Sequence, residues 1–290
     1  MEAKDSSTGL RVAFRVLYPT GAIERPQRLG PYTMTVATDA GLEGKDLPVV
    51  LVSHGAGGSS LAHRDLGAHL ARAGFVVALV EHPGDSRDDA SLSRTAANLA
   101  RRPLSLRLAL DAMFAHPGVG PRLAPAVGVV GHSMGAYTAL AIAGGRPSAF
   151  PHETPDGKPA KVPVTPDPRV KALVLLAPAA AWFMEEGALS GVRAPILMVT
   201  GEKDFITPAV VHARLIERGV ADPSRLEHLV APGAGHFSFQ SPFPQAMRIP
   251  GFLPAQDPPG FDRAAFQQSL GPRIEAFLDR ELRALGGRNP

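Results

Sequence analysis

The stretch AVGVVGHSMGAYTAL, residues 126–140, decides how the rest of the chain is interpreted. Its apolar first half predicts a buried strand, and the small residues that follow Ser133 predict a helix. Between the two, GHSMG at 131–135 fits the pattern G-x-S-x-G. That pattern sets a serine on a sharp, strained turn above a sheet, where flanking side chains would collide with neighbouring backbone. We therefore interpret Ser133 as a catalytic nucleophile. The competing interpretation is a plain turn serine.

Apolar runs alternate with helical patterns on both sides of this stretch. Strands with both faces buried are predicted at 47–55, 75–82, 126–131, 170–177, 194–201 and 226–232. Helices are predicted over 61–73, 103–114, 134–143, 208–218 and 262–284, with Pro103 in a first turn and a kink or split at Gly271 and Pro272. Segments 11–19 and 32–38 alternate and predict half-exposed, antiparallel strands. This order predicts an α/β fold, in which helices cover both faces of a mostly parallel sheet.

The pattern shows no repeat and no second core, so we predict a single domain over residues 1–290. Two proline-rich insertions interrupt it, near 147–168 and 240–260. Ordered loops of this length are often lids or binding loops. A disordered surface insertion is the alternative for the first of them.

Composition excludes several classes of function. The net charge of +3 is small and the basic residues are scattered, so no nucleic-acid partner is expected. The absence of cysteine removes disulfides, thiolate nucleophiles and zinc–cysteine sites together. The polar start MEAKDSSTGL is not a signal peptide, and no apolar run approaches the ~20 residues of a membrane span. We expect a cytoplasmic protein without stable membrane insertion, unless a leader has been removed. The oligomeric state is left open.

A serine nucleophile needs a base and an orienting carboxylate. In the order Ser, acid, His, these would follow it along the chain. Asp204 lies in the loop after the strand at 194–201, and His236 follows the strand at 226–232 after a glycine-rich turn. Both lie at carboxyl ends of predicted parallel strands, where sites of open α/β sheets form. Glu202 is the nearest alternative acid, and His132 is expected to pack around the turn.

An acyl-transfer site also needs backbone N–H groups that bind the developing oxyanion. The residue after the nucleophile, Met134, would supply one. The loop SHGAGG at 53–58 follows a buried strand and would supply the second, from Ala56 or alternatively from Gly55 or Gly57.

The same loop supports another class of function. GAGGSS at 55–60 nearly matches the dinucleotide fingerprint G-x-G-x-x-G, with Ser60 in place of the third glycine. Glu81 stands about where a ribose-binding acid would lie. A dinucleotide-binding oxidoreductase is therefore one alternative, and a hydrolase fold that has lost catalysis and only binds is another.

Three segments carry a family resemblance: VVLVSHGAGGSS at 49–60, LARAGFVVALVEHPGD at 70–85 and VGVVGHSMGA at 127–136. The chain resembles α/β-hydrolases over nearly its whole length. More narrowly, it resembles platelet-activating factor acetylhydrolases and bacterial predicted dienelactone hydrolases. The resemblance implies an eight-stranded sheet, a Ser–His–acid triad, no metal and no organic cofactor. It carries the nucleophile onto Ser133, the base onto His236 and the oxyanion donors onto Ala56 and Met134.

The chain departs from that resemblance in two places. Acetylhydrolases of this type look to place the acid after the strand that follows the elbow helix, but VKALVLLAPAAAW at 170–182 offers no carboxylate there. This departure favours Asp204, one strand later. Dienelactone hydrolases resemble a cysteine version of the elbow, whereas this chain has no cysteine.

The sequence thus predicts a cofactor-independent serine hydrolase of small carboxylic esters, with short to medium acyl chains. Ser133 would attack the acyl carbon, His236 would move the proton and Asp204 would orient the imidazole. Aromatic residues that line an acyl pocket in this interpretation, or else form plain core, are Trp182, Phe183, Phe237, Phe239 and Phe243.

Overall fold

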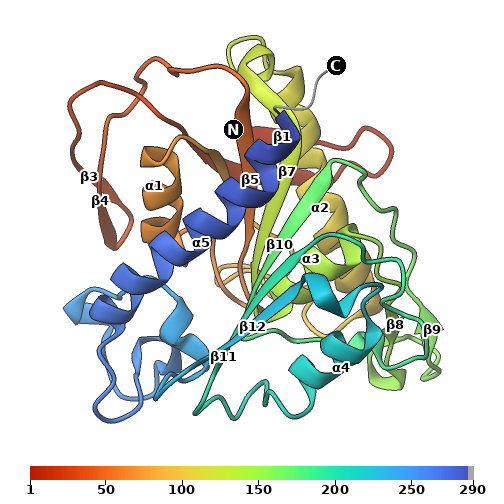
Figure 1. Ribbon diagram of the computed structural model, residues 1–290. Helices are drawn as coiled ribbons and strands as arrows, with labels where there is room; N and C mark the ends of the chain where they lie inside the picture. Colours follow the sequence, from red (N-terminus) through yellow and green to blue (C-terminus); the bar gives the residue numbers. More distant parts are fainter. Residues whose placement is uncertain (287–290) are drawn as a thin grey trace.

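The computed structural model describes residues 1–286, and an eight-stranded sheet forms its centre (Figure 1). The strands lie in the order β1-β2-β6-β5-β7-β10-β11-β12. From β6 to β12 all neighbours are parallel, whereas β2 is antiparallel to both β1 and β6. This confirms the predicted mostly parallel sheet; residues 287–290 of the predicted domain lie outside the described residues. The strands span Glu2–Lys4 (β1), Arg11–Leu17 (β2), Leu47–Ser53 (β5), Val76–Val80 (β6), Leu123–His132 (β7), Val170–Leu176 (β10), Ile196–Gly201 (β11) and Leu226–Ala231 (β12).

Helices cover both faces of the sheet, as predicted (Figure 1). Helices α1 (Arg64–Arg72) and α5 (Arg263–Gly286) lie on one face, and α2 (Ala96–Ala115), α3 (Met134–Ile142) and α4 (His212–Gly219) lie on the other. Successive residues of a strand point to opposite faces. In β5, Val49 and Leu51 therefore join the core under α2 and α3, while Val50 and Val52 join the core under α1 and α5.

Two small hairpins lie outside the main sheet. Strand β4 (Tyr32–Val36) pairs with β3 (Arg25–Leu29), a strand whose sequence RPQRL carries no apolar alternation and was not predicted. Strands β8 (Ser148–Ala149) and β9 (Ala160–Lys161) pair within the first proline-rich insertion. The second insertion packs Phe243 against Tyr32 of the β3–β4 hairpin, with ring centroids 6.3 Å apart.

Helix α2 begins earlier than its apolar periodicity predicts. Thr95 caps it by accepting a hydrogen bond from the backbone N–H of Asn98, so Pro103 lies in the helix interior and not in the first turn. An interior proline leaves the carbonyl four residues before it without its usual donor. Here that carbonyl belongs to Leu99, and the buried hydroxyl of Tyr137 donates to it at 3.0 Å. A side chain of α3 thus supplies the hydrogen-bond donor that Pro103 lacks.

Two other helices differ from their predicted limits. A kink or a split was predicted at Gly271 and Pro272; helix α5 runs through both residues, so it is not split there. Pro272 has no N–H to donate to the carbonyl of Gln268. Gln268 is exposed, so water can form the missing hydrogen bond. Helix α4 starts at His212, after a turn on the carbonyl of Pro208. Within residues 1–286, no helix combines the length and the apolar character that crossing a bilayer requires.

Candidate active site

The serine of the GHSMG stretch stands on a strained turn between β7 and α3. Ser133 has φ +54° and ψ −118°, a conformation that side-chain-bearing residues rarely adopt. A Cβ on Gly131 would lie 2.2 Å from the carbonyl oxygen of Gly135, and a Cβ on Gly135 would lie 1.9 Å from that of Ser53. Both positions therefore require glycine because α3 is pressed against the neighbouring strand ends.

Backbone hydrogen bonds hold this turn to the end of β10. The N–H of Ser133 donates to the carbonyl of Leu176 at 2.9 Å, and the carbonyl of Ser133 accepts from the N–H of Ala179 at 3.1 Å. The serine itself remains partly exposed. The strain of the turn is thus supported from the neighbouring strand while the hydroxyl stays accessible.

The structure brings Ser133, His236 and Asp204 together. His236 Nε2 lies 2.9 Å from Ser133 Oγ, and His236 Nδ1 lies 2.9 Å from Asp204 Oδ2. His236 is 4% exposed and the side chain of Asp204 only 1%. A carboxylate that accepts the Nδ1 proton leaves Nε2 free to accept the proton of the serine. The three residues come from three different strand ends, as their order in the sequence suggests.

Thr207 completes the surroundings of the carboxylate. Asp204 Oδ1 accepts the N–H groups of Ile206 and Thr207, both at 2.9 Å, and the Thr207 hydroxyl lies 2.8 Å from Oδ2. Burial alone would raise the pKa of Asp204, but the hydrogen bond and charge of His236, with the bonds from Thr207, outweigh it and lower that pKa. The site therefore favours an ionised carboxylate beside the imidazole.

The alternative acid, Glu202, is placed elsewhere. Its Oε2 accepts the backbone N–H of Gly233 at 2.7 Å, and the residue is exposed. It thus pins the turn that precedes His236 instead of contacting the ring.

His132 packs into the turn, as expected from its position beside the serine. Its Nε2 lies 2.9 Å from the backbone carbonyl of His236, to which a neutral ring donates. Its ring centroid lies 5.0 Å from that of His236 and 5.2 Å from that of His63. Burial and the neighbouring histidines hold the pKa of His132 well below 6.5. Sequence alone did not reveal this link to the backbone of the base.

The loop after β5 passes directly beside the serine. A Cβ on Gly55 would lie 3.2 Å from the Cβ of Ser133. The N–H of Gly57 donates to Asp85 at 3.2 Å, so it is already occupied. Among the described residues, the N–H of Ala56 meets no protein acceptor. Met134 is the first residue of α3, where helix geometry supplies no intrahelical acceptor for its N–H.

The five aromatic residues singled out in the sequence have different surroundings. Phe237 lies edge-on to the ring of His236, with centroids 5.0 Å apart. Phe239 is buried against Phe266, and Phe183 is buried against Tyr137. The Trp182 indole donates to the carboxylate of Glu153. Phe243 packs against Tyr32 of the β3–β4 hairpin. Among the described residues, only Phe237 of the five contacts the ring of His236.

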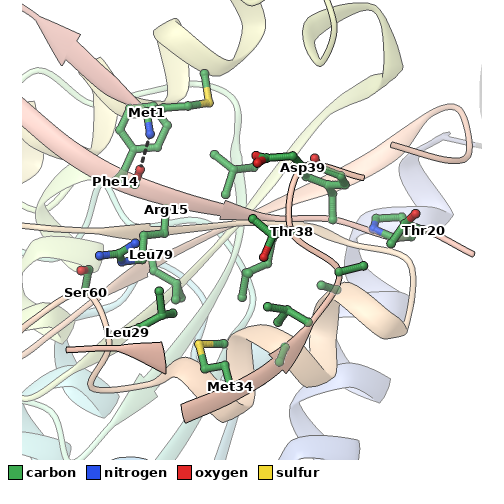
Figure 2. Close-up of a pocket in the computed structure, with 18 of the residues that line it drawn as sticks. Met1, Phe14, Arg15, Thr20, Leu29, Met34, Thr38, Asp39, Ser60 and Leu79 are labelled. Atoms are coloured by element: carbon green, nitrogen blue, oxygen red, sulfur yellow. Dashed lines mark hydrogen bonds between the residues drawn. The ribbon is translucent and has the colours of Figure 1, made fainter. Parts of the chain in front are cut away.

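Two cavities of the described residues lie outside the group formed by Ser133, His236 and Asp204. A cavity of about 700 Å³ opens between the β3–β4 hairpin, β2 and α1, where Leu29, Met34 and Leu79 line it (Figure 2). Ser133, Asp204 and His236 are not part of its wall. A second cavity, of about 430 Å³, lies beside the loop that carries Asp204. Its wall includes Met184, Val210 and Val211, which are all exposed apolar side chains.

Within the described residues, no group of three or more histidine, aspartate or glutamate side chains is arranged so that it could hold a metal ion. Sequence reasoning also missed a set of buried polar residues under the 54–57 loop, namely Asp85, Asn98 and Arg102. Their types are usually exposed. They lie far from the G-x-S-x-G stretch in sequence, so no local pattern marks them.

Comparison with known proteins places this arrangement in context. The sequence model of the family "Platelet-activating factor acetylhydrolase, isoform II" matches residues 5–102, a segment that includes the 54–57 loop and ends before Ser133. A search of curated proteins finds no match. The chain is similar to the structure of a ferulic acid esterase from Streptomyces cinnamoneus, with a TM-score of 0.71 and 21% identity over 98% of this chain and 88% of that one.

It is also similar to the structure of a dienelactone hydrolase from Anabaena variabilis, with a TM-score of 0.55 and 18% identity over 97% of this chain and 98% of that one. Together with the strand order and the serine turn, these likenesses show that the chain has the α/β-hydrolase fold.

Proposed function

We propose that this protein is a serine hydrolase that cleaves carboxylic esters through an acyl-enzyme. The observation that carries the proposal is the unbroken hydrogen-bonded line from Ser133 Oγ to His236 to Asp204, at 2.9 Å for each contact. A serine hydroxyl is a weak nucleophile unless a base takes its proton, and this line supplies the base together with the group that orients it.

The proposed reaction follows from the geometry. His236 Nε2 takes the Ser133 proton as Oγ attacks the ester carbonyl, and the imidazolium that forms is stabilised by Asp204. The N–H groups of Ala56 and Met134 bind the oxygen that becomes negative. His236 then protonates the leaving alcohol. In the second half, His236 takes a proton from water as the water attacks the acyl-enzyme, and it returns a proton to Ser133 Oγ as the acid leaves.

The apolar residues near the acid loop bear on the substrate. Phe205 is 80% exposed directly after Asp204, and the exposed Val210 and Val211 follow on the same loop. A rim of this kind suits esters with an apolar acyl or alcohol group, and we propose short to medium acyl chains. The ferulic acid esterase and the dienelactone hydrolase to which the fold is similar support an ester or lactone substrate.

The dinucleotide alternative receives no support from the 55–60 loop. A phosphate site needs free backbone N–H groups at the start of a helix. Here the N–H of Gly57 donates to Asp85 and that of Ser60 donates to Glu81 at 2.7 Å, while α1 begins only at Arg64.

The proposal is tested with p-nitrophenyl acetate and butyrate and with a fluorophosphonate that labels activated serines. Ser133→Ala should reduce turnover by roughly 10⁴-fold or more, because triad members act as a unit, and it should abolish labelling. A variant that keeps most of its activity contradicts the assignment. A wild-type protein that is neither active nor labelled contradicts the proposed hydrolysis and favours the alternative of a fold that has lost catalysis.

A further inference from the structure

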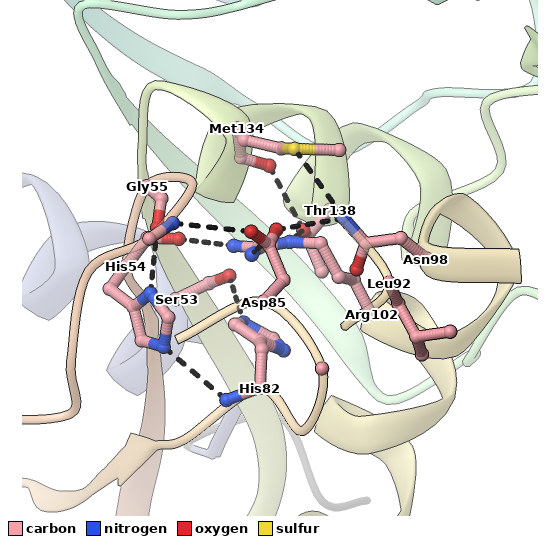
Figure 3. Close-up of polar contacts among 12 residues, drawn as sticks. Ser53, His54, Gly55, His82, Asp85, Leu92, Asn98, Arg102, Met134 and Thr138 are labelled. Atoms are coloured by element: carbon pink, nitrogen blue, oxygen red, sulfur yellow. Dashed lines mark hydrogen bonds and ion pairs between the residues drawn. The ribbon is translucent and has the colours of Figure 1, made fainter. Parts of the chain in front are cut away.

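A buried ion pair lies under the loop that carries Ala56 (Figure 3). Arg102 Nη1 of α2 donates to Asp85 Oδ2, from the loop after β6, at 2.7 Å, and each side chain is 1% exposed. Removing two charges from water costs nearly as much as their attraction returns, so such a pair adds little net stability. What it holds in place is therefore the more informative property.

The pair grips the 54–57 loop at two points. Asp85 Oδ1 accepts the N–H of Gly57 at 3.2 Å, and Arg102 Nη2 donates to the carbonyl of His54. These two contacts flank Gly55 and Ala56. The conformation between them is further fixed because His54 Nδ1 bonds the carbonyl of Gly55 at 2.7 Å. Burial and the charge of Arg102 lower the pKa of His54 to about 3, so its ring is neutral and donates.

The same pair reaches the start of α3. Arg102 Nε donates to Thr138 Oγ1 at 3.0 Å, and that hydroxyl in turn donates to the carbonyl of Met134 at 3.0 Å. Asn98 closes the set by donating to Asp85 Oδ2 at 2.8 Å. Figure 3 shows these side chains converging between the loop and the first turn of α3.

We propose that Asp85 and Arg102 are positioning residues of the oxyanion hole, which hold the N–H groups of Ala56 and Met134 at a fixed separation. The two donors belong to segments about 80 residues apart, and this cluster bonds both segments from below. An oxyanion is stabilised only by donors that are already aimed at it. This inference rests on the proposed ester hydrolysis, because it concerns the same site.

The first test compares Asp85→Asn with the wild-type protein on p-nitrophenyl butyrate. An amide in place of the carboxylate must turn its NH₂ either toward Gly57 or toward Arg102 and Asn98, so at least one contact of the cluster is lost. A misplacement of ~1 Å in a catalytic group costs on the order of 10²-fold in rate. We expect kcat to fall by about 10- to 100-fold, with KM changed by less than about 3-fold.

A trifluoromethyl ketone provides a second measurement on the same variant. It forms a tetrahedral adduct with the serine whose oxyanion occupies the hole, so its affinity should fall in proportion to kcat. A merely structural role would lower the melting temperature and leave the affinity of the folded protein unchanged.

The matched control is Asp167→Asn. Asp167 is also buried and pairs with Arg169, but it precedes β10 at the end of the strand opposite to the serine. It should lose stability while kcat and inhibitor affinity stay at the wild-type level. If Asp85→Asn folds and its kcat stays within about 3-fold of wild type, the inference is wrong.

Thr138 variants decide the matter if Asp85→Asn does not fold. Thr138→Val keeps the shape and removes the hydroxyl that links Arg102 to Met134, so kcat should fall several-fold. Thr138→Ser restores the hydroxyl and should restore kcat. Equal kcat in the Val and Ser variants overturns the inference. If the wild-type protein turns over esters and reacts with the fluorophosphonate, but these variants have wild-type kcat, only the positioning role is refuted. An inactive, unlabelled wild type refutes the proposed function itself.

Discussion

The ring of His132, the residue directly before Ser133, bonds the backbone carbonyl of His236 through Nε2 at 2.9 Å. The segment that carries the proposed nucleophile therefore also holds the main chain of the proposed base. The ring is 1% exposed and its pKa lies well below 6.5, owing to burial first and to the charges of neighbouring groups second. A neutral ring of this kind only holds the main chain in place; it does not compete for the proton that His236 is proposed to move.

The hydrogen bond from His132 to the His236 carbonyl predicts that two substitutions at position 132 differ in kcat. Gln at position 132 can still donate to the His236 carbonyl, so His132→Gln should retain most of kcat. His132→Phe keeps the bulk without the donor, and we expect kcat to fall by about 10-fold as the base loses its fixed position. Steady-state kinetics on p-nitrophenyl butyrate measures both. Equal rates for the two variants would show that packing alone matters at this position.

The placement of the acid predicts a second split. In Asp204→Asn the amide oxygen can keep the N–H groups of Ile206 and Thr207, so its NH₂ faces His236 Nδ1 and favours the wrong tautomer. A loss of about 10⁴-fold in kcat is expected. Glu202→Gln is its matched control, because Glu202 bonds Gly233 and does not reach the ring. Its kcat should stay within about 3-fold of wild type. A larger loss in Glu202→Gln than in Asp204→Asn would return the acid role to Glu202.

The close approach of α3 to the sheet predicts the cost of a single methyl group. A Cβ on Gly135 would lie 1.9 Å from the carbonyl oxygen of Ser53, which is backbone and cannot rotate away. Gly135→Ala should lower the free energy of unfolding by about 3 kcal/mol or more. Gly41→Ala, at a position with open space around it, should leave it nearly unchanged. Urea denaturation compares the two, and similar midpoints would mean that α3 can shift without cost.

The bond from Tyr137 to Leu99 predicts a coupling between α2 and α3. Tyr137→Phe leaves the carbonyl of Leu99 without a donor and should cost about 1–3 kcal/mol of unfolding free energy. In a Pro103→Ala background the helix N–H returns to that carbonyl, so the same substitution should cost much less. Denaturant melts of the four proteins in this cycle test the coupling. An identical cost in both backgrounds would show that the hydroxyl does not replace the missing helix bond.

Buried histidines predict how stability depends on pH. Burial lowers the pKa of His63 from 6.5 to about 4, although its Nδ1 bonds the carbonyl of Phe239 at 3.1 Å. Between these two values the unfolded chain binds a proton that the folded chain does not. Stability is therefore full above pH 6.5 and declines as the pH falls toward 4, on the order of 3 kcal/mol for this residue.

Urea denaturation at pH 7 and pH 4.5 measures this effect. His63→Asn places an amide N–H near the position of Nδ1 without a titrating group, so its stability should fall less on acidification. His152→Gln, at an exposed position, should keep the wild-type pH dependence. If His63→Asn and wild type lose equal stability, the protonation of other groups dominates the decline.

Much of the sheet could be predicted because its strands are continuous apolar runs between turn residues. The runs at 47–55 and 170–177 became β5 and β10 with small shifts at their ends. Strand β3 could not be predicted, because two arginines and a proline among five residues give no alternation. The start of α2 escaped for a similar reason: Thr95 sets it by capping, ahead of the first apolar periodicity.

In the candidate site, too, some residues could be predicted from the sequence and others could not. Ser133, Asp204 and His236 could be picked out because each follows a recognisable strand, and the structure places His236 within hydrogen-bond distance of the other two. Asp85 and Arg102 could not, since they meet only through a contact between a loop and a helix, 17 residues apart in sequence. Polar residues that meet only in three dimensions leave no periodic trace in a sequence.

The end of β10 is bonded to the loop that carries Asp204. Ala177, directly after the strand, has φ +44°, and its carbonyl accepts the hydroxyl of Thr207 at 3.0 Å. Thr207 in turn contacts both Asp204 and His236, so this one side chain links the end of β10 to both residues. The proposed acid of this chain follows β11, and the neighbouring strand β10 is held to it through Thr207.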